Sequence, residues 1–100
     1  MPFSHEMLSK VWAKASPVGT NDPNLYRKDQ CGAWIKWSEY GNRDSEYGWE
    51  VDHITPVSER GSDELSNLRP LQWENNADRA TGRLNCPVTA SDNIHNVRQR

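Results

Sequence analysis

Four polar residues within 25 positions have the types and the spacing that hydrolysis of a phosphodiester requires. They are the adjacent pair Asp52 and His53, then Asn67 and Asn76, with Arg79 one helical turn after Asn76. Cutting a phosphodiester at neutral pH needs a base that activates water and a cation that offsets charge on the phosphate and the leaving oxygen. A neutral imidazole can be that base, and carboxylate and amide oxygens suit a hard divalent ion such as Mg²⁺. The cluster therefore predicts metal-assisted phosphodiester hydrolysis.

A longer segment around these residues resembles a known family. Residues 49–82, WEVDHITPVSERGSDELSNLRPLQWENNADRATG, are similar to the HNH (ββα-metal) endonucleases. In that family a strand delivers an Asp-His or His-His pair, and a helix supplies the last His or Asn. The resemblance implies that His53 is the general base and that Asp52 and Asn76 hold the metal ion. It also implies that the amide of Asn67 pins the loop behind His53, and that the substrate is DNA.

Two departures from the family pattern affect the expected metal chemistry. The last motif position is Asn instead of His, which shifts the expected ion toward Mg²⁺ or Mn²⁺. The cysteine pairs that hold a structural zinc in many members are absent, so one divalent ion and no structural zinc are expected. Hydrophobic packing is then expected to replace the zinc.

The choice between the adjacent Asn75 and Asn76 rests on register. Two residues separate Asn76 from Arg79, as the family spaces its last ligand from the following basic residue. Adjacent helical positions point about 100° apart, so only one of the two amides can face the ion. Arg79 and Arg69 are the first candidates for contacting the nucleic acid, while a solvated helix position is the other interpretation of Arg79.

The elements that must position these residues can be predicted from hydrophobic spacing. Residues 4–15 predict an amphipathic helix with Ser4 as its N-cap, and residues 16–24 predict a loop because they are rich in Pro, Gly, Asn and Asp. Between Gly32 and Gly41 a short aromatic and β-branched run favours extended structure.

The motif itself is predicted to form a strand, a loop, a second strand and a helix. In WEVDHI, Trp49 and Val51 alternate with polar residues, so Asp52 is expected to point away from the core. LRPLQ predicts the second strand, and the helix is expected from about Trp73 to about Thr81, with Gly82 as its C-cap.

These elements define an α+β fold class: a small ββα-metal core, made of a short two-stranded sheet plus a helix, with an added N-terminal helix. A length of 100 residues fits one domain, and we expect residues 1–100 to form a single HNH nuclease domain with its core motif at 49–82. The polar tail at 83–100 is compatible with either a docked extension or a frayed end.

The overall charge excludes a simple basic nucleic-acid binder. The formal net charge is −2, and acidic and basic residues are spread evenly along the chain. Affinity for DNA must therefore come from a local basic face and from the metal ion.

The cysteines and the hydropathy profile indicate a soluble, cytoplasmic protein. Cys31 and Cys86 are isolated, so reduced, structural thiols are expected. The chain has no apolar stretch long enough to span a bilayer, and its first residues lack the pattern of a signal peptide. No membrane partner is expected.

The remaining aromatic and histidine residues have structural interpretations. Trp34, Trp49 and Trp73 are expected in the core, although aromatic side chains could also stack on bases. His5 and His95 lie in polar contexts outside the motif and are expected at the surface.

Three functional hypotheses follow. The first is a metal-dependent endonuclease that hydrolyses DNA, and the second is a nucleic-acid-binding module that keeps the HNH fold without catalysis. The third is an accessory subunit whose specificity or recruitment comes from another protein, because the chain has no separate DNA-reading domain. The residues alone leave open the choice between DNA and RNA, between nicking and double-strand cleavage, and the oligomeric state.

Overall fold

The computed structural model describes residues 3–99, in which short antiparallel strand pairs are combined with two α-helices. The helices and strands are α1 (His5–Trp12), β1 (Tyr26–Lys28), β2 (Trp34–Lys36), β3 (Trp49–His53), β4 (Leu68–Gln72), α2 (Trp73–Arg79), β5 (Val88–Ala90) and β6 (Asn96–Arg98). The pairs are β1 with β2, β3 with β4, and β5 with β6. The order β3, β4, α2 is the ββα unit that the sequence predicts.

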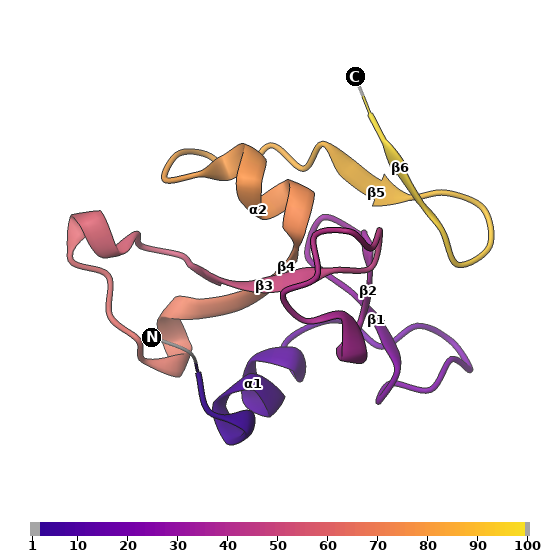
Figure 1. Ribbon diagram of the computed structural model, residues 1–100, viewed down its shortest axis with the longest axis horizontal. Coiled ribbons are helices and arrows are strands. Elements are labelled where there is room, and N and C mark those ends of the chain that lie inside the picture. Colours follow the sequence, from indigo (N-terminus) through magenta and orange to yellow (C-terminus); the bar gives the residue numbers. More distant parts are fainter. Residues whose placement is uncertain (1–2, 100) are drawn as a thin grey trace.

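The β3–β4 hairpin lies at the centre, between the two helices (Figure 1). Its register pairs Trp49 with Gln72 and His53 with Leu68, so the whole of β3 is matched by β4. Successive side chains of a strand point to opposite faces, and the indole of Trp49 packs in the core with α1. Asp52 lies on the other face, toward α2, as the alternation predicts.

The core is formed by α1 and the Trp49 face of the hairpin. The buried cluster comprises Val11, Trp12, Ala15, Ile35, Trp49 and Leu68. The Ser4 side chain accepts a hydrogen bond from the Met7 amide and caps α1, which confirms the predicted N-cap. Burial of Trp34 and Trp49 is confirmed, whereas Trp73 is only half-buried and its indole donates to the Ser45 carbonyl.

Helix α2 follows β4 directly and is shorter than predicted. The Gln72 side chain caps its first turn by accepting from the amides of Glu74 and Asn75. The helix ends at Arg79, and its C-cap is Ala80 with φ 50°. The prediction that Gly82 caps the helix is therefore wrong, because the capping residue, which has a positive φ, comes two positions earlier.

The segments on either side of the motif form small hairpins. Only Trp34–Lys36 of the predicted extended run is a strand, since Trp37–Glu39 turns into a 3₁₀ helix. Strand β1 is not predicted from the sequence, and it pairs with β2 through only three residues. The tail is docked: β5 and β6 pair, and the Asn96 side chain bonds to Trp34 and to the Glu46 carbonyl.

A disulfide joins Cys31, in the loop before β2, to Cys86, just before β5. The expectation of two reduced thiols is therefore wrong. The two cysteines are 55 positions apart, and no local pattern relates them because only the docking of the tail brings them together. This covalent link ties the segment before the motif to the segment after it. Among residues 3–99, no helix has the length and apolar character needed to cross a membrane.

Candidate active site

The ββα unit brings four of the predicted residues to one place. A pocket of about 220 Å³ is lined by Asp52 and His53 from β3 together with Asn76 and Arg79 from α2. Its remaining lining comes from Val51, Pro56, Val57, Ala80 and Thr81. Asn76 and Arg79 share a face of α2 because they are one helical turn apart, whereas Asp52 and His53 alternate on β3 and both reach the pocket at the end of the strand.

His53 lies between this pocket and a second hollow. The second pocket, of about 400 Å³, is lined by Phe3, Val57, Gly61 and Asp63 as well as His53. His53 Nε2 is 2.6 Å from Asp63 Oδ1, and within residues 3–99 no hydrogen bond involves His53 Nδ1. The Phe3 ring lies 6.2 Å from the imidazole, centroid to centroid. One nitrogen of the imidazole is thus held while the other is available for chemistry.

Asn67 holds the loop that connects β3 to β4. Its Nδ2 donates to the carbonyls of Thr55 and Ser62, and its Oδ1 accepts from the Thr55 amide. The loop closes tightly at Gly61, where a Cβ would lie 1.7 Å from the Thr55 carbonyl oxygen. The Asn67 side chain therefore fixes both ends of the loop that begins directly after His53.

Asp52 is buried between two arginines. Its side chain is 4 % exposed, with Arg69 Nε 2.7 Å from Oδ2 and Arg79 Nη1 3.1 Å from Oδ1. Arg79 is itself 7 % exposed and donates to the Ile54 carbonyl, so the interpretation of Arg79 as a solvated helix residue is wrong. Arg79 lines the pocket together with Asp52, whereas Arg69 holds the other oxygen of this carboxylate from outside the lining.

Asn76 and Asn75 have different surroundings. Asn76 lines the pocket, and its Nδ2 donates to Glu50 Oε1 over 2.8 Å. Asn75 is fully buried, where it bonds to Asp29 and to both backbone groups of Val88. Asn76 thus lines the pocket, and Asn75 lies in a buried structural network.

Glu50 fixes the orientation of the Asn76 amide. Burial raises the pKa of Glu50, but the hydrogen bonds from Arg43 and Asn76 and the charge of Arg43 outweigh it, so the pKa lies below its ordinary value. An ionised carboxylate can only accept, so it holds Asn76 Nδ2. Asn76 Oδ1, the atom that would bind a metal ion, accepts no hydrogen bond from any described residue.

The donor set fits a hard divalent ion. Each carboxylate oxygen of Asp52 accepts one hydrogen bond from an arginine and has a second lone pair for a metal ion. Asn76, in the same pocket, has an amide oxygen that accepts no hydrogen bond from any described residue. Among residues 3–99, no group of three or more His, Cys, Asp or Glu could hold a metal ion. Asp52 and Asn76 are thus the two candidate oxygen ligands in the pocket, and water and substrate oxygens would have to complete the coordination.

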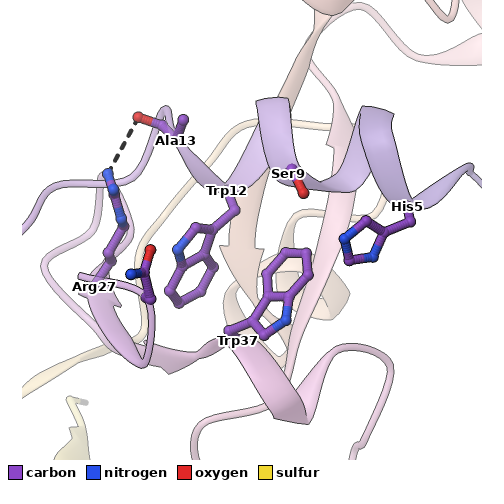
Figure 2. Close-up of a pocket in the computed structure, with 7 residues that line it drawn as sticks. His5, Ser9, Trp12, Ala13, Arg27 and Trp37 are labelled. Carbon is purple, nitrogen blue, oxygen red and sulfur yellow. Dashed lines mark hydrogen bonds between the residues drawn. The ribbon is translucent and has the colours of Figure 1, made fainter. Parts of the chain in front are cut away.

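Another pocket, of about 320 Å³, lies beside α1 and contains none of the predicted site residues. Figure 2 shows the indoles of Trp12 and Trp37 side by side in this pocket, with His5 at one end and Arg27 at the other. The Arg27 guanidinium bonds to the carbonyls of Ala13, Ala15 and Pro23. His5 packs edge-on against Trp37 and is exposed, as expected for a surface histidine, and His95 is exposed as well.

Two acidic residues at the site, Glu50 and Asp63, are not predicted from the sequence. Glu50 has the same alternation as Asp52 on β3, so the strand pattern could have indicated that both face α2. Asp63 lies in the loop ten positions after His53, where no periodicity predicts which side chains return to the site.

The comparison with protein families agrees with this geometry. Residues 30–75 match the family model described as HNH endonuclease. No curated protein and no solved structure matches the chain significantly. The match spans β2, β3, β4 and the start of α2, and it supports nuclease-type activity on a nucleic acid. Residues 30–75 of this chain are thus similar to the HNH endonuclease family.

Proposed function

We propose that this protein is a metal-dependent endonuclease that hydrolyses DNA phosphodiester bonds. The observation that carries the proposal is the pocket in which Asp52, His53 and Asn76 meet, within an HNH family match. His53 is the general base, Asp52 and Asn76 are the metal ligands, and Asn67 holds the loop behind His53.

The residues of the chain divide the reaction between them. His53 Nδ1 takes a proton from water while the water oxygen forms a bond to phosphorus. The bond from phosphorus to the leaving sugar oxygen breaks, and solvent supplies the proton that this oxygen needs. Arg69 and Arg79 keep the carboxylate of Asp52 in place, and Arg79 brings a guanidinium to the pocket lining, where it favours a phosphate.

A bound Mg²⁺ or Mn²⁺ would offset the negative charge that develops on the phosphate and the leaving oxygen. Oxygen ligands from Asp52 and Asn76 suit these hard ions. The two arginines repel a cation, so we expect weak binding of the free ion that strengthens when the substrate phosphate is present.

Plasmid cleavage in Mg²⁺ and in Mn²⁺ tests this function. We expect wild type to cleave, EDTA to abolish cleavage, and His53→Ala to lose about 10²- to 10⁴-fold in rate because its general base is gone. His95→Ala is the matched control, since His95 is exposed and contacts Glu46. Equal cleavage by wild type and His53→Ala would refute the mechanism.

The second candidate function is nucleic-acid binding by an HNH domain without catalysis. The observation that favours it is the engagement of both Asp52 oxygens by arginines, which weakens this carboxylate as a metal ligand. Calorimetric titration with Mn²⁺ in the presence of a duplex decides between the two. Duplex binding without ion uptake or cleavage would support the binding module.

We propose that the entire chain acts as one nuclease unit, because the Cys31–Cys86 disulfide and α1 tie its flanks to the motif. A separate specificity or recruitment protein remains part of the proposal, and co-purification tests it. The cytoplasmic location stays a prediction, and the disulfide argues against it because reducing compartments keep thiols reduced.

A further inference from the structure

We propose that Asp63 is a positioning residue that holds the His53 imidazole in the tautomer with a free lone pair on Nδ1. The inference rests on the proposed nuclease function and adds to it a residue outside the predicted set of site residues. It stands on the contact between the two side chains and on the way the loop presents Asp63.

The contact fixes the direction of the hydrogen bond. His53 Nε2 and Asp63 Oδ1 are 2.6 Å apart, which is the short distance of a charge-assisted hydrogen bond. An ionised carboxylate has no proton to donate, so Nε2 must carry the hydrogen. In a neutral imidazole Nδ1 then has the lone pair, and this nitrogen makes no hydrogen bond to any described residue. The ring is therefore prepared to accept a proton at Nδ1.

Asp63 has no other visible task in the fold. Its side chain is 71 % exposed, and the bond to His53 is its one side-chain hydrogen bond within residues 3–99. The neighbouring carboxylate, Glu64, makes no side-chain hydrogen bond in the described part of the chain. Asp63 can thus be changed without removing a contact that the core requires.

The loop is built to keep Asp63 opposite His53. Asn67 Nδ2 holds the carbonyl of Ser62, the residue directly before Asp63. Gly61 allows the backbone to pass so close to Thr55 that a Cβ could not fit. Asn67 and Gly61 together therefore hold the loop so that the Asp63 carboxylate lies beside His53. The role that the HNH resemblance implies for Asn67, holding this loop, thus includes placing Asp63.

The kinetic test compares Asp63→Asn and Asp63→Glu with Glu64→Gln as the matched control. In Asp63→Asn the amide can donate to Nε2 and so favour the wrong tautomer. We expect kcat to fall about 10- to 100-fold, as for other partners that orient a histidine, with KM unchanged. Asp63→Glu restores the carboxylate and should regain most of kcat, and Glu64→Gln should behave as wild type.

The spectroscopic test needs no metal and no turnover. Ring ¹⁵N spectra of the protein in EDTA, at a pH where imidazole is neutral, report which nitrogen carries the hydrogen, with His53→Ala supplying the assignment. We expect the Nε2–H tautomer in wild type and a shift toward Nδ1–H in Asp63→Asn, at an unchanged melting temperature.

Two results would overturn the role of Asp63: kcat for Asp63→Asn equal to that of Glu64→Gln, or an Nδ1–H tautomer in wild type. Failure of the proposed function looks different. A wild-type protein that cleaves nothing with any divalent ion would remove the nuclease mechanism, whereas the ring spectra would still decide whether Asp63 sets the tautomer of His53.

Discussion

At the scale of single residues, the site is defined by hydrogen bonds that give neighbouring polar groups different tasks. Asn75 and Asn76 are adjacent on α2, yet one amide bonds to Asp29 and Val88 in the interior and the other to Glu50 at the pocket. The helical rotation of about 100° between neighbours separates the two environments. Identical side chains thus serve folding in one case and, as we propose, ion binding in the other.

This difference leads to opposite results for two alanine variants. Asn76→Ala should weaken Mn²⁺ binding and leave the melting temperature close to wild type, because its amide lies at the pocket. Asn75→Ala should cost about 1–3 kcal/mol of stability, because the buried Asp29 carboxylate and the Val88 amide lose their hydrogen bonds to Asn75. This variant should still bind the ion. Calorimetric titration and thermal denaturation of both variants measure the two effects. Loss of the ion in Asn75→Ala would show that the helix is rotated from the position described.

Glu50 is expected to make the free energy of unfolding depend on pH in the acidic range. The pKa of Glu50 is lowered in the folded state because its bonds to Arg43 and Asn76 outweigh its burial. Its contribution is therefore fully present above the unfolded pKa, near 4.5, and is lost as the pH falls through the lower folded pKa. The pair with Arg43 is partly exposed, so we expect at most about 1 kcal/mol. Denaturant unfolding at pH 3 to 7 should show this loss in wild type and in the control Glu59→Gln, but not in Glu50→Gln.

At the scale of elements, Asp29 joins the β1–β2 hairpin to the junction of β4 and α2. Its Oδ1 accepts from the amides of Cys31 and Ala33, and its Oδ2 accepts from the Gln72 amide and from Asn75 Nδ2. Burial raises the pKa of Asp29, and these hydrogen bonds offset part of the rise. Asp29 is 3 % exposed, so water cannot take the place of its carboxylate as the hydrogen-bond acceptor for these donors.

Removing this carboxylate should loosen α2 from the rest of the protein. In Asp29→Ala four donors, three of them in buried hydrogen bonds, lose this acceptor, and we expect a loss of at least about 2 kcal/mol in the free energy of unfolding. Asp22→Ala is the control, because Asp22 is an exposed loop residue that accepts from the Asn24 amide. Urea denaturation provides the measurement, and equal midpoints for the two variants would contradict the linking role of Asp29.

At the scale of the whole molecule, the fold surrounds a small ββα unit with supports on both sides. Helix α1 covers one face of the β3–β4 hairpin, α2 covers the other, and the docked tail lies beside α2 (Figure 1). The Cys31–Cys86 disulfide closes this arrangement across 55 positions. A core of few apolar residues is thereby reinforced by a covalent link, as is common in small domains.

Reduction of the disulfide should therefore lower the free energy of unfolding and leave the residues that line the pocket in place. A cross-link that closes a loop of this length contributes about 2–4 kcal/mol, which corresponds to a fall of roughly 10 °C or more in Tm for a chain of this size. Scanning calorimetry of wild type with and without a reductant, and of the double variant Cys31→Ser/Cys86→Ser, measures the effect. A reductant that leaves the Tm of wild type unchanged would contradict a stabilising role for the link.

Local spacing in the sequence by itself determined the motif and the order of its elements. The adjacency of Asp52 and His53, the strand alternation and the helical turn from Asn76 to Arg79 predicted the ββα unit and the face on which Asp52 lies, because these relations hold within one element. The N-cap of α1 was predictable for the same reason.

Only the tertiary structure decided which groups meet across elements. The Cys31–Cys86 pair, the return of Asp63 to His53 and the clamp of Arg69 and Arg79 on Asp52 join segments whose separation carries no periodic signal. Their meeting depends on the loop held by Asn67 and on the docking of the tail. Packing and long-range hydrogen bonds, and not residue spacing, fix both of these.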